Sequence, residues 1–186
     1  MRIITGLAKG RRIEAPEGEG TRPTADKVKG AIFNILNNKV VEASVLDMFS
    51  GTGNLGLEAL SRGASRCIFI EKEQKAFQIL KKNITSLGFE EICEMYHQDA
   101  YIAIEKIKKR GLKLDIIFLD PPYGRQMVIK AIEEISRLDI LDYNGIIISE
   151  YDEKDNLPDK IGKIEAYRTE KYGRTKVTFW SMERES

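Results

Sequence analysis

The stretch that decides the fold is Val45-Leu-Asp-Met-Phe-Ser-Gly51-Thr-Gly53-Asn-Leu-Gly56, in which a short apolar strand runs into a glycine-rich turn and a helix. The glycines let the backbone turn sharply and approach a ligand closely. The helix predicted over residues 54–62 stops at Gly63, and a second apolar strand, 67–70, ends at Glu71. A strand, a helix and a further strand in this order predict the first βαβ unit of a parallel sheet.

The alternation of strands and helices continues through the rest of the chain. Apolar runs predict further strands at 92–97, 115–119 and 145–149, with helices between them, and two last strands at 163–170 and 175–182. The last two are expected to pair antiparallel at or near one edge of the sheet. The predicted fold class is therefore α/β, a doubly wound, mostly parallel seven-stranded sheet of the Rossmann-like type.

An N-terminal region precedes this alternation and has a different character. Residues 2–14 are expected to form two short strands, and residues 24–37 a helix with one apolar face. We expect a single domain, residues 1–186, in which the basic hairpin and loop of residues 1–23 extend a cofactor-binding and catalytic core of residues 24–186.

The composition excludes several classes of protein. With 42% hydrophobic and 32% charged residues, the chain resembles ordinary globular proteins. No apolar run approaches the roughly 20 residues that span a bilayer, and no secretory signal is present, so we expect a cytoplasmic protein without a membrane partner. The single histidine, His97, excludes a His-rich metal site, and we expect no metal. Nothing in the sequence demands a dimer, which favours a monomer.

The charges are unevenly distributed, although the net charge is only +1. Residues 1–12 hold four cations and no acid, and residues 163–176 hold five cations against two acids. If the two segments share a face, they provide a local footprint for phosphate groups without making the whole protein basic.

The glycine turn and the acid that follows it indicate a cofactor that contains adenosine. Glu71 ends the second strand, where a carboxylate can accept hydrogen bonds from both ribose hydroxyls. The spacing Gly51-x-Gly53-x-x-Gly56 also matches the dinucleotide fingerprint of dehydrogenases. However, the strand ends in Asp47, and a carboxylate there disfavours a pyrophosphate and suits a sulfonium with an amino-acid tail. This pattern favours S-adenosylmethionine.

Asp99 follows the third predicted strand, at a position where its side chain can meet an adenine ring. The same carboxylate can instead cap the helix that begins there. Both interpretations are kept.

The turn Asp120-Pro121-Pro122-Tyr123 directly follows the fourth strand. Two prolines remove two N–H donors and leave carbonyl acceptors, and an ionised aspartate only accepts. Such a corner suits an exocyclic –NH₂ group, whose lone pair becomes more nucleophilic when its protons are held, while an aromatic ring can stack on the base. An ordinary strand-ending turn is the alternative interpretation.

The core resembles the class I methyltransferases, and the whole chain resembles the small bacterial methyltransferases that modify N2 of one guanine in 16S ribosomal RNA. The resemblance rests on several stretches: Gly6-x-x-Lys9-Gly10-Arg11, Thr21-Arg-Pro-Thr-x-Asp26-x-Val28, Phe33-Asn34, Val45 to Ala64, Asp120 to Tyr123 and Tyr172-Gly173-x-Thr175. It covers nearly the full length.

The resemblance implies a set of site residues. The expected S-adenosylmethionine site comprises Asp47, Phe49, Gly51, Gly53, Glu71, Lys72, Asp99, Ala100 and Asp120. The expected catalytic corner comprises Asp120, Pro121, Pro122 and Tyr123, with Asp120 and the Pro121 carbonyl on the guanine amine and Tyr123 against the ring. The candidates for contacts with RNA phosphates are Arg11, Arg12, Arg22, Lys171 and Arg174. The implied partner is ribosomal RNA, within the small subunit or an assembly intermediate of it.

Other functions remain open at this point. A DNA adenine-N6 methyltransferase can use the same corner, although the chain has no obvious domain for reading duplex sequence. A protein-glutamine methyltransferase faces the same problem of a weak nucleophile. A ribosome-assembly factor that binds S-adenosylmethionine without catalysis is an alternative from another class.

Overall fold

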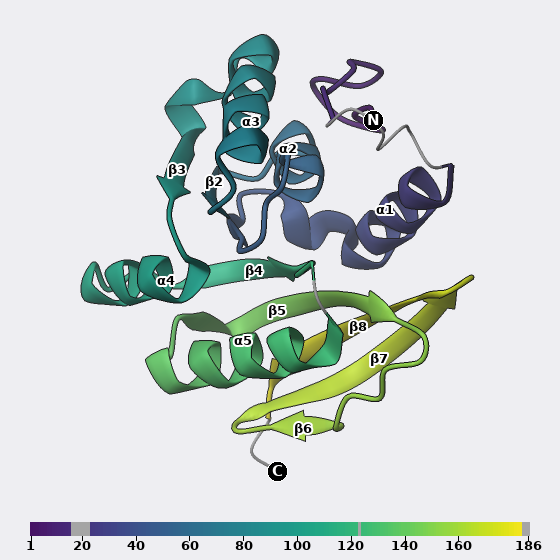
Figure 1. The fold of residues 1–186 in the computed structure, drawn as a ribbon, viewed down its shortest axis with the longest axis vertical. Coiled ribbons are helices and arrows are strands. Elements are labelled where there is room, and N and C mark those ends of the chain that lie inside the picture. Colours follow the sequence, from purple (N-terminus) through teal and green to yellow (C-terminus); the bar gives the residue numbers. More distant parts are fainter. Residues whose placement is uncertain (16–22, 123, 184–186) are drawn as a thin grey trace.

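A computed structural model of the chain describes residues 1–15, 23–122 and 124–183. The strands are β1 (Ser44–Asp47), β2 (Arg66–Glu71), β3 (Cys93–His97), β4 (Leu114–Leu119), β5 (Leu141–Asp152), β6 (Lys160–Ile161), β7 (Ile164–Tyr172) and β8 (Thr175–Met182). The helices are α1 (Pro23–Leu36), α2 (Asn54–Ser61), α3 (Gln74–Leu87), α4 (Ala100–Lys109) and α5 (Gly124–Leu138), with 3-10 turns η1 (Asn37–Val40) and η2 (Glu90–Ile92). All eight strands form one sheet in the order β3-β2-β1-β4-β5-β8-β7-β6 (Figure 1).

The sheet is parallel from β3 to β5 and antiparallel from β5 to β6. The strand order reverses between β1 and β4, because β1 leads outward to β2 and β4 lies on its other side. Ligands bind at such a switch point, beyond the carboxyl ends of the strands. The topology therefore places the candidate site before any side chain is considered.

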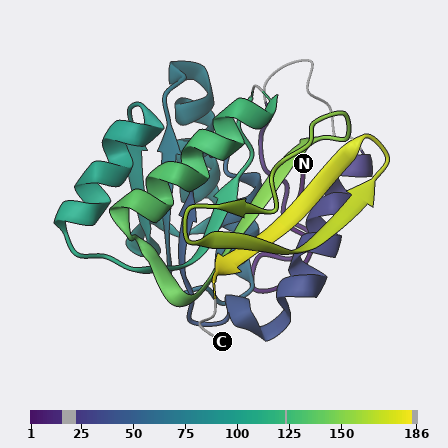
Figure 2. The same cartoon turned by 90° about the horizontal axis from the view of Figure 1, so that it is seen from below.

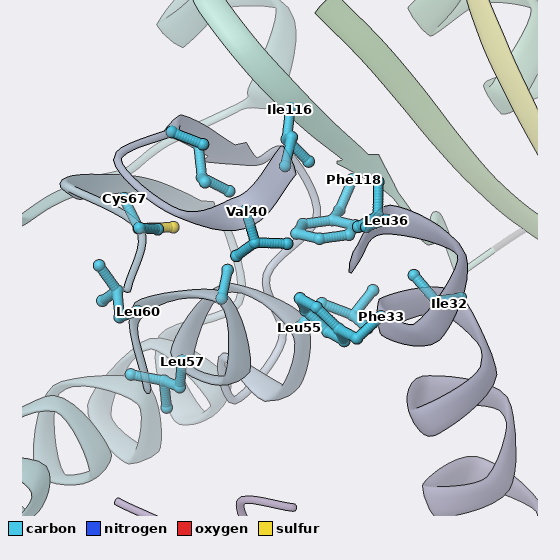
Figure 3. Packing of buried hydrophobic residues seen from close by; sticks show 14 of the residues in the cluster. Ile32, Phe33, Leu36, Val40, Leu55, Leu57, Leu60, Cys67, Ile116 and Phe118 are labelled. Carbon is cyan, nitrogen blue, oxygen red and sulfur yellow. The ribbon is translucent and has the colours of Figure 1, made fainter. Parts of the chain in front are cut away.

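Helices cover both faces of the sheet, and each face has its own hydrophobic core. Helices α1, α2 and α3 pack on one face, whereas α4 and α5 lie side by side on the other (Figures 1 and 2). Successive residues of β4 alternate between the two cores, with Ile116 and Phe118 facing α1 and α2 and Ile117 facing α4 and α5. The core below α1 and α2 brings Phe33 to within 5.7 Å of Phe118 between ring centroids (Figure 3).

The N-terminal segment is held on α2 by one buried carboxylate. Glu58 accepts hydrogen bonds from the backbone N–H groups of Ile4 and Thr5, at 2.8 and 3.1 Å. It also lies 3.4 Å from the ammonium of Lys29, and both of these side chains are fully buried. Burial lowers the pKa of Lys29, and the neighbouring carboxylate partly offsets that effect. The pair therefore fixes α1, α2 and the N-terminal segment relative to one another.

The fold class predicted from the sequence is confirmed, with differences in detail. The sheet has eight strands instead of seven, because two residues, Lys160–Ile161, add a short edge strand. Residues 2–14 contain an isolated bridge between Arg2 and Arg12 in place of two strands. Strand β5 is longer than its apolar centre suggested, since its polar end extends the pairing with β8. No helix among the described residues has the length and apolarity needed to cross a bilayer.

The substitution Glu58→Gln should destabilise the protein, because it leaves the buried Lys29 ammonium without its countercharge. Breaking one side of a buried ion pair typically costs about 3–5 kcal/mol. Urea unfolding followed by circular dichroism measures the loss. The double variant Lys29→Met/Glu58→Gln should lose less than the sum of the two single variants, and strictly additive losses would contradict the coupling.

Candidate functional site

A cavity of about 470 Å³ opens at the switch point, where the carboxyl ends of β1, β2, β4 and β5 meet the helices. It is lined by the glycine loop, by the ends of β2 and β4, by the start of α4 and by Glu150 of β5. The sequence-predicted residues that line it are Asp47, Phe49, Gly51, Glu71, Lys72, Asp99, Ala100, Asp120 and Pro122. A cavity of this size is typical of a cofactor site.

The glycine loop is shaped by the carboxylate at the end of β1. Asp47 is buried, and its Oδ2 accepts a hydrogen bond of 3.0 Å from the N–H of Gly56, in the first turn of α2. The cap position of that helix is Gly53, which has no side chain to satisfy these donors, so Asp47 does so from the strand. Gly53 has φ +89, and a Cβ there would lie 2.6 Å from Leu80 Cδ1. Gly53 therefore turns the loop and packs behind the cavity wall.

Glu71 holds the other side of the loop. Its two oxygens accept backbone N–H bonds from Gly51 at 2.8 Å and from Glu73 at 2.7 Å. Each carboxylate oxygen can accept a further hydrogen bond. Glu71 lines the cavity, so this remaining capacity faces the space in which a ligand would lie.

Polar groups without partners lie at the start of α4. Asp99 caps this helix by accepting a hydrogen bond of 2.9 Å from the N–H of Tyr101. The Gln98 Nε2 and the Tyr101 hydroxyl are buried and have no hydrogen-bond partner among the described residues. Buried polar groups are normally paired. Both residues line the cavity, but these two atoms are themselves buried and are not open to a ligand in it.

The corner after β4 is described up to its second proline. The surface of Asp120 is open to the cavity, Pro122 lines the cavity, and Pro121 is buried. Tyr123 lies outside the described residues, so its predicted place against the base stays a prediction. The corner and the glycine loop open into one cavity, as the chemistry inferred from the sequence requires.

Sequence reasoning missed Glu150, which lies beside Asp120. The pairing of Leu119 with Ser149 makes Asp120 and Glu150 the next pair along the parallel strands β4 and β5. Both residues also face the α1 side of the sheet, by the alternation of the strand. Glu150 follows the apolar run 145–149 just as Asp120 follows 115–119, and this signal was available in the sequence.

The carboxyl groups of the cavity wall retain protons more strongly than usual. Burial raises the pKa of Asp47 to about 7, and Asp120 and Glu71 contribute to the same rise. Protein atoms surround Asp120 behind its open face, and this desolvation raises its pKa to about 6. Burial raises the pKa of Glu150 to about 8, and the negative charge of Asp120 adds to this rise. Three such acids in one wall favour a cationic ligand.

The predicted RNA-binding cations differ in how free they are. Arg11 donates to the backbone oxygen of Ser86, and Arg12 is exposed with no ion pair among the residues that the structure describes. In contrast, Lys171 pairs with Glu153 at 2.5 Å and Arg174 approaches Asp152 at 3.5 Å. Arg22 lies outside the described residues. The N-terminal cations are therefore better placed to meet phosphates than those of the β7–β8 hairpin.

The fold and the cleft define a class I methyltransferase. Comparison with known proteins then gives the family: the chain belongs to the one described as "Conserved hypothetical protein 95", which matches residues 1–181. This membership confirms the resemblance inferred from the sequence.

Relatives match over most of the chain. The Bacillus subtilis protein YlbH is 39% identical over 180 residues, covering 97% of this chain and 98% of its own length. Ribosomal RNA small subunit methyltransferase D of Escherichia coli is 34% identical over 158 residues, covering 85% of this chain and 78% of its own. The solved structure of the protein yhhF from Escherichia coli superposes with a TM-score of 0.84 at 27% identity, covering 100% of this chain and 99% of the other.

The pKa of Asp47 predicts a pH-dependent effect of Asp47→Asn on stability. The folded protein keeps the Asp47 proton up to about pH 7, whereas an unfolded chain releases it near the ordinary aspartate pKa of 3.8. The folded state therefore loses stability relative to the unfolded chain as the pH rises between these two pKa values. Asparagine carries no charge, so the free energy of unfolding of the variant relative to wild type should rise from pH 5 to pH 8 by about 1–3 kcal/mol.

This effect is measured by urea unfolding of the cofactor-free proteins at the two pH values. The same difference between variant and wild type at both values would contradict it.

Proposed function

We propose that this protein transfers a methyl group from S-adenosylmethionine to the exocyclic N2 amine of a guanine in 16S ribosomal RNA. One observation carries the proposal: the acceptor corner at Asp120 opens into the same cavity as the glycine loop. The relatives from Escherichia coli and Haemophilus influenzae, named Ribosomal RNA small subunit methyltransferase D, support the RNA as substrate class.

The cavity fits S-adenosylmethionine. The free acceptor capacity of Glu71 suits ribose hydroxyls, and Asp99 lines the cavity at the expected adenine end. Asp47, with its raised pKa, suits the cationic part of the cofactor. When bound, the cofactor supplies a methyl group activated by the positive sulfur.

The role of Asp120 follows from the nucleophile. The lone pair of an aromatic amine is delocalised into its ring, so the amine attacks poorly. Asp120 accepts a hydrogen bond from one amine proton, and the Pro121 carbonyl accepts one from the other. Together they favour a pyramidal nitrogen. A hydrogen bond to a charged group contributes about 1.5–3 kcal/mol of stabilisation. Methyl transfer leaves the nitrogen with one proton too many, and the Asp120 carboxylate takes it. Tyr123 completes the corner by stacking on the base.

The RNA is bound through its phosphates. Arg11 and Arg12 make this contact, together with Arg22. Lys171 and Arg174 contribute less, because carboxylates already neutralise them. A paired base cannot reach the cavity, so the target is unpaired or flipped, which costs about a few kcal/mol. We take the chain as one catalytic unit acting on the small subunit or its assembly intermediate.

Replacing Asp120 by Ala should lower kcat by about 100-fold or more, because the transition state loses a positioned polar group. The dissociation constant for S-adenosylmethionine, measured by equilibrium dialysis, should change little. The assay is transfer of labelled methyl groups to small subunits purified from a strain that lacks this protein, followed by mapping of the modified base.

The control for Asp120→Ala is Asp159→Ala, since the exposed Asp159 lies beyond β5 and does not line the cavity. Naked RNA, duplex DNA and protein serve as parallel substrates. Preferred labelling of DNA or protein, or a normal rate for Asp120→Ala, would overturn the proposed function.

The substitutions Arg11→Glu and Arg12→Glu together should weaken RNA binding and reduce its dependence on salt. Removing one cation from a phosphate should lower the slope of log K against log salt concentration by about 0.7–0.9. The matched pair Lys171→Glu and Arg174→Glu should have a smaller effect. Filter binding at several salt concentrations measures both, and equal slopes for the two double variants would refute the placement.

A further inference from the structure

Glu150 is a second carboxylate at the corner that carries the proposed chemistry. Leu119 of β4 pairs with Ser149 of β5, so Asp120 and Glu150 are the next neighbours on strands that run in the same direction. Paired strands lie about 4.8 Å apart, and residues in register project to the same face of the sheet. Both side chains line the cavity. The backbone thus places two acids side by side at its wall.

The backbone around Glu150 is held by strand β8. Its cross-strand partner on β8 is the buried Val177. The preceding residue, Ser149, is fully buried, and its Oγ accepts a hydrogen bond of 2.9 Å from the indole N–H of Trp180. The backbone at this point therefore cannot easily move the two carboxyl groups apart.

No cation among the described residues neutralises the two acids. Lys29 lines the cavity from α1, but it lies against Glu58 and donates to the Arg2 carbonyl and to Asn54. Lys176, next to Val177 on β8, donates to the carbonyl of Asp155.

The other described side chains that line the cavity near the pair form no ion pair with either acid; the side chain of Arg125, after the corner, lies outside the described part of the chain. Strand β1 contributes Asp47, a further acid, and α5 contributes the apolar Met127. Lys72 lines the cavity after β2 and has an exposed side chain. Two neighbouring carboxyl groups in such surroundings favour the retention of one proton between them.

We propose that Glu150 is a positioning residue that shares one proton with Asp120, donating a hydrogen bond as the neutral acid to the Asp120 carboxylate. This inference rests on the proposed function. The shared proton leaves a single negative charge at the corner, and it orients the remaining lone pairs of Asp120 toward the amine. The raised pKa of both groups is in agreement with this arrangement.

A comparison of two substitutions at Glu150 tests the role. Gln keeps a hydrogen-bond donor of the same length and has no charge, and so it imitates the neutral acid, whereas Ala removes the donor. We expect Glu150→Ala to lose about 10- to 100-fold in kcat, as misplaced catalytic groups do, and Glu150→Gln to recover most of that loss. The matched control is Glu133→Gln, on the exposed face of α5.

The pH profile separates positioning from a purely structural role. The wild-type rate should fall above about pH 8, where Glu150 also ionises and repels Asp120. Glu150→Gln should lack this alkaline fall. If Glu150→Gln is as slow as Glu150→Ala, or if Glu150→Ala is as fast as wild type, the proposal is overturned.

A measurement without methyl transfer keeps this inference distinct from the proposed function. Carbon-13 NMR of the side-chain carboxyl groups follows each proton directly in the cofactor-free protein. Wild type should show one carboxyl group of the pair protonated at pH 7, and that signal should be absent in Glu150→Gln and shifted in Asp120→Asn.

Two ionised carboxylates at pH 7 would overturn the inference, whatever the RNA assays show. A shared proton in an enzyme that methylates no RNA would support the inference and defeat the proposed function.

Discussion

The site depends on a parallel register that brings several acids to one edge of the sheet without a matching cation among the described side chains. Asp47 and Asp120 lie at or just after the carboxyl ends of β1 and β4, and Glu150 lies near the end of β5, on the face that α1 and α2 cover. The pKa values of all three carboxyl groups are raised, mainly because the groups are buried. A wall of this kind is poorly suited to a phosphate and well suited to a cation next to a hydrogen-bond donor. Those are the two parts that amine methylation brings together.

The charged groups that support the site are, by contrast, fully paired. Lys29 and Glu58 link α1, α2 and the first residues of the chain, and Arg62 adds a hydrogen bond of 2.7 Å to the same carboxylate. Lys29 also reaches Asn54, the first residue of the helix that follows the glycine loop. The N-terminal segment is therefore part of the frame of the cavity, which agrees with the place of Met1 in its wall.

Much of the fold could be predicted because its signals are local. The strand ending at Asp47, the glycine turn and the helix after it are consecutive in sequence, and each has a distinct pattern of apolar residues. The short edge strand β6 gave no such signal, because two residues show no periodicity. Two strands were predicted where the structure has a single bridge between Arg2 and Arg12. Hydrogen bonds to the Glu58 side chain hold this segment in place of a regular set of strand hydrogen bonds.

The site was predicted less completely, because neighbours in space are not neighbours in sequence. Asp120 is recognised through its two prolines, whereas Glu150 has no such marker, and its neighbourhood to Asp120 follows only from the register of β4 and β5. The pairing of Lys171 and Arg174 with carboxylates before them in the chain likewise emerges only when β7 and β8 fold back on the end of β5.

The retained protons of the cavity wall also affect how the protein responds to its ligand. A positive ligand makes ionisation of nearby carboxyl groups easier, so its arrival expels protons into the solvent. The heat released on binding then includes the heat of protonation of whatever buffer absorbs those protons. Calorimetric enthalpies recorded in phosphate and in Tris would differ for this reason alone, although the ligand touches the same protein atoms in both.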